Sequence, residues 1–141
     1  RGYLAVTEGA PPRPSGTVRS LLRETSVHRV YSGRGGKEAV THYTTRSGNG
    51  KYALLELSID TGRKNQIRVH LSELGCPVAG DRMYGAATDP LGRLCLHAHE
   101  LALTDPFTGA ARTFRAEPPA GFFAITRPDR SEKRLAIGEK V

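Results

Sequence analysis

The sequence predicts an α+β domain with a mixed, mostly antiparallel sheet and one central helix. Two observations carry this prediction. Sixteen glycines and nine prolines divide the 141 residues into short apolar runs, which is typical of strands joined by turns. Only one segment shows the apolar spacing of an amphipathic helix. The length corresponds to a single domain, since domains average about 150 residues.

The first half is expected to be built from strands. Residues 2–8 alternate between two faces as a strand does, and residues 10–15 (APPRPS) form a loop. Residues 27–31 and 38–45 are rich in β-forming residues, and the glycine-rich turn 32–36 separates them. The segment RSGNG at 46–50 indicates a hairpin turn before the strand 51–59.

The helix is expected at residues 64–74. Ile67, Leu71 and Leu74 recur there at helical spacing, and Gly75 is a suitable stop. Residues 93–103 indicate another strand, with 112–116 as its antiparallel partner, and residues 121–125 close the fold. We therefore expect one domain over residues 1–126. Residues 127–141 are interpreted as a charged tail that is disordered.

The charge is distributed unevenly along the chain. Residues 1–70 hold twelve Lys and Arg against five Asp and Glu, whereas residues 71–141 hold nine of each. The net charge of +7 therefore belongs to the first half, and such an excess suits a polyanion such as RNA, DNA or a membrane surface. The absence of an apolar run near eighteen residues excludes a membrane-spanning helix. Two cysteines without CxxC spacing favour reduced thiols and a cytoplasmic protein.

The densest group of polar residues is the segment TGRKNQIRVH at 61–70, between the best strand and the helix. A strand end that meets a helix N-terminus gathers free backbone N–H groups and attracts anions. Arg63 and Arg68 could bind a phosphate there, or hold a carboxylate in its ionised form. The alternative is that both arginines are ordinary solvated charges on a helix face.

Three other patterns favour structural interpretations. The glycine-rich segment SGRGG at 32–36 lacks the spacing of a phosphate loop and is interpreted as a hairpin connection. Cys95, His97 and His99 would share one face of a strand, but their spacing does not match that of a zinc finger, and we predict no metal site. Asp81 could be a catalytic acid, although its position in GDRMYG favours a turn residue that bonds its own backbone.

Several blocks together resemble the RluA-type family of RNA pseudouridine synthases. They cover about residues 1–125 in the order and spacing of the family: YLAVTEG at 3–9, GKEAVTHY at 36–43, LELSIDTGRKNQIRVHL at 55–71, GCPVAGDRMYG at 75–85, LCLHAHELAL at 94–103 and DPFTG at 105–109. The resemblance implies a pseudouridine synthase catalytic fold. It also implies isomerisation of uridine to pseudouridine in a flipped-out nucleotide, with no metal or cofactor.

The resemblance also implies roles for individual residues. Arg68 matches the basic residue that pairs with the nucleophilic aspartate, and Tyr3 matches the tyrosine that stacks on the base. Leu96 resembles the apolar residue that lines the uracil pocket, and Arg63 is a plausible phosphate or structural partner. We therefore expect Arg68 and Tyr3 to be catalytic, and four further residues to bind substrate: Arg63, Asn65, Gln66 and Leu96.

The sequence departs from the family in two places. Asn65 stands where the family usually has histidine, so the contact made by that ring is altered or dispensable. The family's nucleophile lies in an HRLD block upstream of the YLAL strand, and the 141 residues contain no such block. The chain thus resembles the C-terminal part of a catalytic domain, which we expect to be inactive alone. The partner is RNA, ribosomal or transfer RNA, with no membrane role. A truncated sheet could also pair its edge with a second copy.

The alternative from a different class is an RNA-binding module that uses the same fold without chemistry.

Overall fold

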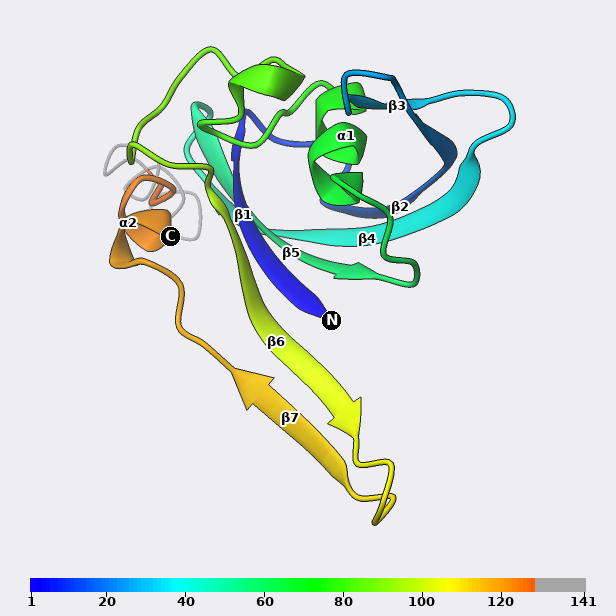
Figure 1. The fold of residues 1–141 in the computed structure, drawn as a ribbon. Coiled ribbons are helices and arrows are strands. Elements are labelled where there is room, and N and C mark those ends of the chain that lie inside the picture. Colours follow the sequence, from blue (N-terminus) through cyan, green and yellow to red (C-terminus); the bar gives the residue numbers. More distant parts are fainter. Residues whose placement is uncertain (129–141) are drawn as a thin grey trace.

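A seven-stranded sheet with one main helix against it forms the body of the protein (Figure 1). The computed structural model describes residues 1–128. The strand order across the sheet is β3-β2-β4-β5-β1-β6-β7. The elements in chain order are β1 (Gly2–Glu8), β2 (Ser15–Glu24), β3 (Val30–Ser32), β4 (Lys37–Gly48), β5 (Tyr52–Ile59), α1 (Gln66–Glu73), the 3₁₀ helix η1 (Arg82–Tyr84), β6 (Leu96–Thr104), β7 (Ala111–Arg115) and α2 (Ala120–Ala124).

The six strand pairs of the sheet are all antiparallel. The predicted α+β class is confirmed. The parallel component expected of a mixed sheet is limited to one isolated bridge, between Gly9 and Tyr52. The N-terminal strand β1 lies inside the sheet, between β5 and β6, although β5 follows it by more than forty residues. Its alternating side chains contribute Ala5 and Val6, both fully buried, to the main core.

The strongest apolar patterns form the elements predicted for them. The predicted strand 2–8 matches β1, and the strand 51–59 is β5 with one residue less. The helix is shorter than expected, because residues 64 and 65 belong to the turn that precedes α1. Gly75 adopts a φ of 86° after the helix, which is the left-handed conformation of a helix stop. The strands 93–103 and 112–116 correspond to β6 and β7, which pair as expected.

The first half differs from expectation in two ways, one wrong strand and one missed strand. The segment 27–31 does not start a strand, because residues 25–29 form a turn in which the Thr25 N–H donates to the Arg29 carbonyl at 2.8 Å. Strand β3 begins only at Val30. Strand β2 was not foreseen, because it buries only Leu22 along its ten residues and so lacks an apolar face. Residues 121–125, which were expected to close the fold, overlap the short helix α2.

Helix α1 packs against the sheet and completes the body. Ile67 and Leu71 bury one side of α1 against the main core. A second cluster joins the helix to β2, β3, β4 and η1, and its members are Leu22, Val30, Ala39, Val69 and Tyr84. The predicted tail 127–141 lies, from residue 129 on, outside the described residues. Within residues 1–128 no helix has the length and apolar character needed to cross a membrane.

The hairpin of β6 and β7 extends away from the body (Figure 1). Every residue of β7 is exposed, and the apolar side chains of Leu103, Phe107 and Phe114 on this hairpin face solvent. Strand β7 is an edge strand of the sheet. Edge-to-edge pairing with a second copy remains a prediction.

The buried histidine of α1 predicts a dependence of stability on pH. His70 is fully buried, with Nδ1 2.8 Å from the Thr41 hydroxyl and Nε2 2.8 Å from the Ser20 hydroxyl. Burial lowers the pKa of His70 below its ordinary value of 6.5. As the pH falls, the unfolded chain therefore takes up this proton before the folded one does. The contribution of neutral His70 to stability is fully present above pH 6.5. We expect the free energy of unfolding to fall as the pH drops below 6.5, by at most about 1.4 kcal/mol per pH unit.

Urea unfolding between pH 7.5 and 5 measures this contribution. The variant His70→Gln should be less stable at pH 7.5 but should lose less of its stability on acidification than the wild type. The variant Thr113→Ser, at an exposed position of β7 that carries no titratable group, should keep the wild-type decline. Parallel pH profiles for wild type and His70→Gln would contradict the assignment.

Candidate active site

A pocket of about 300 Å³ lies at the turn that connects the end of β5 to the start of α1. One wall is the sheet and the other is the turn that leads into the helix. Its lining is Tyr3, Ile59, Arg63, Asn65, Gln66, Ile67, Arg68, Leu94 and Leu96. All six residues that the sequence indicated as catalytic or substrate-binding therefore meet at one cavity: Tyr3, Arg63, Asn65, Gln66, Arg68 and Leu96. Their individual roles remain predictions.

The sheet wall brings together two residues that are far apart in the sequence. In the antiparallel pair of β1 and β6, Tyr3 lies opposite Ala98 and Ala5 lies opposite Leu96. Tyr3 and Leu96 are thus diagonal neighbours on the same face of the sheet, within reach of an aromatic side chain. An aromatic ring beside an apolar side chain, in a cavity that also holds polar side chains, suits a planar base with a polar edge.

Arg68 forms a bidentate ion pair with Asp81. Its Nε donates to Oδ2 and its Nη2 donates to Oδ1, both at 2.8 Å. The Asp81 side chain is 1% exposed and that of Arg68 is 22% exposed, so the pair is well shielded from water. The hydrogen bonds that Arg68 donates to Asp81 raise the pKa of Arg68 above its ordinary value. Two parallel charge-assisted bonds fix the plane of the guanidinium as well as its position.

The interpretation of Asp81 as a residue that bonds its own backbone is therefore wrong for its side chain. The carboxylate is taken by Arg68, while the Asp81 carbonyl accepts from the Ala86 N–H at 2.9 Å. The GDRMYG segment does make a turn, and η1 lies within it. This turn brings Asp81 to the side of α1. Pairing of Arg68 with a nucleophilic aspartate from an upstream block remains a prediction.

Tyr84 and Asn65 hold the other sides of the same guanidinium. The Tyr84 ring lies 5.0 Å from the Arg68 carbon Cζ, and Arg29 lies at 5.1 Å from the ring. Asn65 accepts from Arg68 Nη1 at 3.2 Å and donates to the Tyr84 hydroxyl at 3.1 Å. The Tyr84 hydroxyl also accepts from the Val30 N–H at 3.0 Å. Arg68 is thus held in one orientation, with part of Nη1 still available to a ligand.

Asn65 owes its place to an unusual backbone conformation. It has a φ of 56° at the residue before α1, a region that asparagine tolerates better than most residues. Its side chain makes no cap to the helix and instead links Arg68 to Tyr84. The amide present where the family usually has histidine is therefore engaged with protein groups.

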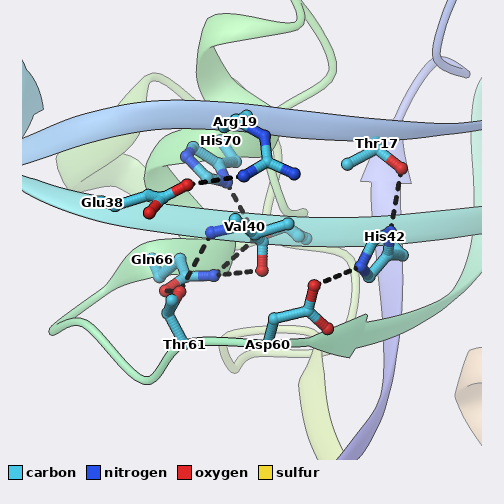
Figure 2. A network of polar contacts seen from close by, with 10 residues as sticks. Thr17, Arg19, Glu38, Val40, His42, Asp60, Thr61, Gln66 and His70 are labelled. Carbon is cyan, nitrogen blue, oxygen red and sulfur yellow. Dashed lines mark hydrogen bonds and ion pairs between the residues drawn. The ribbon is translucent and has the colours of Figure 1, made fainter.

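Gln66 is a structural residue rather than a hydrogen-bonding partner for substrate. Its Oε1 accepts from the Thr61 hydroxyl at 2.7 Å and from the Arg63 N–H at 3.1 Å. Its Nε2 donates to the Val40 carbonyl and the Thr41 hydroxyl, both at 2.9 Å (Figure 2). All four hydrogen-bonding positions of the amide are used, and the residue is 3% exposed. A substrate-binding role for Gln66 would therefore rest on packing in the pocket rather than on its amide, and it stays a prediction.

Cys76, Cys95 and His97 have ordinary structural settings, whereas Nδ1 of His99 is buried without a hydrogen-bond partner. The Cys95 thiol donates to the Arg93 carbonyl, and burial raises its pKa. Burial also raises the pKa of Cys76 to about 11, so both thiols are protonated near neutral pH. His97 bonds the Ala116 carbonyl at 2.9 Å. Residues 1–128 hold no group of three or more His, Cys, Asp or Glu side chains suited to a metal ion.

The family model for RNA pseudouridylate synthases matches residues 1–73, which is half of the chain. The chain belongs to this family. A relative in Bacillus subtilis named as the uncharacterized RNA pseudouridine synthase YhcT is 38% identical over 131 residues, covering 90% of this chain and 43% of that protein. The ribosomal large subunit pseudouridine synthase D of Nitrosomonas europaea is 34% identical over 142 residues, covering 93% of this chain and 41% of that protein.

Solved structures of human pseudouridylate synthase domains have the same fold. Human RNA pseudouridylate synthase domain containing 1 matches with a TM-score of 0.76 and 25% identity, over 99% of this chain and 65% of that one. The domain-containing protein 4 matches with a TM-score of 0.68 and 28% identity, over 86% of this chain and 59% of that one. The chain spans about two fifths of the length of the curated relatives it matches.

The sequence indicated Arg68 but missed the residues that orient it. Asp81 was assigned to a turn, and Tyr84 was given no role. The signal that could have found them is the GDRMYG block, in which an aspartate and a tyrosine three residues apart follow a glycine. That spacing places both side chains beside the same neighbouring element when the segment forms a 3₁₀ turn.

The Arg68–Asp81 pair predicts an unequal response to mutation. Arg68→Ala would leave the Asp81 carboxylate buried without a counter-charge, which costs about 3–5 kcal/mol of stability. Asp81→Asn should cost less, because the amide oxygen still accepts from Arg68 and the guanidinium has some access to water. A double-mutant cycle with Arg68→Ala and Asp81→Ala should show a coupling above about 1 kcal/mol.

Urea unfolding at pH 7 provides the measurement. The exposed pair Arg46–Glu56 is the matched control, and its coupling should stay below about 1 kcal/mol. Equal coupling in the two cycles would show that burial of Asp81 adds nothing to the pair.

Proposed function

We propose that this chain forms part of an RNA pseudouridine synthase that isomerises uridine to pseudouridine in structured RNA. The observation that carries the proposal is the pocket that gathers an aromatic ring, an apolar side chain and an immobilised arginine. We infer that the substrate is ribosomal or transfer RNA and that the enzyme acts in the cytoplasm. The name of the Nitrosomonas europaea relative supports the ribosomal part of this inference.

The reaction would use the pocket as follows. The target nucleotide is flipped out of the RNA so that its base stacks on Tyr3 beside Leu96. An aspartate from a segment outside these residues starts cleavage of the bond between ribose C1′ and base N1. The base turns, a bond forms between C1′ and C5, the C5 hydrogen leaves as a proton, and N1 takes up a proton. Atoms balance without any co-reactant.

Arg68 would supply a fixed positive charge at this pocket. Its remaining Nη1 hydrogen can reach an anionic group that Asp81 does not occupy, and the ion pair prevents the guanidinium from turning away. Arg63 lines the same pocket and is assigned to a phosphate of the bound nucleotide.

A second candidate function is an RNA-binding module that has the same fold and performs no chemistry. The favouring observation is that none of the aspartates at 60, 81, 89 and 105 lines the pocket. Asp60 bonds His42, and Asp81 is committed to Arg68. The two candidates differ in one outcome, the formation of pseudouridine by the protein made from the complete reading frame.

Release of tritium from RNA labelled at C5 of uridine tests the enzyme. We expect release by the wild-type protein made from the complete reading frame. In that protein Arg68→Ala should slow single turnover at least a hundredfold, which corresponds to about 2.7 kcal/mol at 1.36 kcal/mol per tenfold. Arg68→Lys should recover only part of the rate, because lysine keeps the charge but not the planar pair of donors.

The control is Lys51→Ala, which should keep the wild-type rate. Lys51 lies in the turn between β4 and β5, at the opposite end of β5 from the pocket residue Ile59. Retention of more than about a third of the rate by Arg68→Ala, well under 1 kcal/mol by the same conversion, would remove Arg68 from the mechanism. No release by the wild-type protein from any RNA would favour the binding module.

A further inference from the structure

A second cavity, of about 460 Å³, lies next to the pocket and is not used by the proposed reaction. We refer to it as the basic groove. It is formed by the end of β2, the start of β3, the glycine-rich loop before β4 and the turn before α1. Its lining is Leu22, Arg23, Glu24, Val30, Gly35, Gly36, Lys37, Gly62, Arg63 and Lys64. The segment that the sequence favoured as a plain hairpin connection is thus one wall of a cavity.

The charge in the basic groove is predominantly positive. Four basic side chains and one acidic side chain line it. The acid, Glu24, accepts from Lys64 Nζ at 2.7 Å and from His28 Nδ1 at 2.9 Å, and the bond from Lys64 lowers the pKa of Glu24. Lys64 therefore balances the one acid, which leaves three cationic groups: Arg23, Lys37 and Arg63.

Two of these cations are anchored without being neutralised. Arg63 Nε donates to the Glu38 carbonyl at 2.8 Å, and Arg23 Nη1 donates to the Arg34 carbonyl at 3.0 Å. The Glu38 carboxylate itself pairs with Arg19. In the described part of the chain, neither Arg23, Lys37 nor Arg63 has an ion pair with an acidic residue. Arginines held by one nitrogen keep further N–H donors for a ligand, and phosphate oxygens are suited to them.

The glycine-rich loop leaves room for a ligand at the backbone. Gly35 has a φ of 83°, and no heavy atom lies within 4 Å of the position that a Cβ would occupy there. Gly36 is pressed against β2, where a Cβ would lie 2.6 Å from the Leu22 backbone. The loop thus lies flat along β2 and presents bare backbone, which permits the close approach of a phosphate group.

The basic groove and the pocket share Arg63. Residues 62–64 line the groove and residues 65–68 line the pocket, so the two cavities meet along one turn. We propose that the basic groove binds the backbone phosphates of the RNA strand that continues from the nucleotide in the pocket, with Arg23 and Lys37 as its distal contacts. This inference rests on the proposed function and assigns the surface on which the substrate lies.

Fluorescence anisotropy with a labelled 16-nucleotide oligouridylate, at 50–300 mM KCl, tests the groove in the full chain. In the double variant Arg23→Gln/Lys37→Gln, the log–log dependence of affinity on salt should become less steep by about 1.4, since each phosphate contact in a single strand contributes about 0.7. The double variant Lys51→Gln/Arg112→Gln removes the same charge outside the groove and should leave the slope nearly unchanged.

A gain of binding separates the electrostatic effect from damage to the fold. Glu24→Gln removes the one acidic charge of the groove and should tighten binding of the same oligouridylate. Equal loss of slope in the two double variants would reduce the effect to net charge and overturn the proposal. So would unchanged affinity in Glu24→Gln, or groove variants that lose binding to phosphatidylserine vesicles but not to RNA.

The groove and the enzyme activity fail separately. In the complete protein, Arg23→Gln/Lys37→Gln should raise the KM for RNA in the tritium-release assay. An active wild type whose KM is insensitive to this variant overturns the groove and leaves the synthase intact. A wild type that releases no tritium, yet loses RNA binding in this variant, overturns the synthase and leaves the groove intact.

Discussion

The buried amide of Gln66 fixes the turn between β5 and α1, and the pocket depends on that turn. Figure 2 shows the amide beside Val40 of β4 and Thr61 of the turn. Through Val40 and Thr41 it attaches the first residue of α1 to β4, and through Thr61 and the Arg63 N–H it closes the turn upon itself. Each of these partners would be costly to leave unpaired in a buried site. The positions of Arg63 and Asn65 before the helix, and of Arg68 within its first turn, follow from this anchor.

A second constraint is that Arg68 is held by groups from separate parts of the chain. Asp81 comes from the turn of η1, and Asn65 comes from the start of α1. The pair with Asp81 cancels much of the arginine charge, so the pocket is less electropositive than a free guanidinium would make it. What the arrangement provides is direction, because Asp81 and Asn65 fix the orientation of an arginine that lines the same cavity as Tyr3 and Leu96.

The sequence predicted those features whose signal is local. Strands β1 and β5 and the helix α1 carry their own apolar periodicity, and the resemblance placed all six expected residues at one pocket. Strand β2 escaped prediction, because a strand with one buried residue in ten owes its stability to its neighbours. The pairing of Arg68 with Asp81 escaped as well, since thirteen residues separate them and only the folded turn brings them together.

The uneven charge along the chain now has a spatial meaning. The cations of the first half are spread over β2, β4, α1 and the segments between elements. Three of them converge on the basic groove without an ion pair to an acidic residue, while the pocket beside it has its arginine paired with Asp81. A polyanion gains most from unpaired, partly hydrated cations whose counterions it can displace, whereas a reacting base gains from charges fixed in a dry setting. The two cavities meet these opposite demands, and each takes part of its lining from the same ten-residue segment, 61–70. Arg63, which lines both and is anchored through its Nε to β4, joins the surface that holds the strand to the pocket that holds the base.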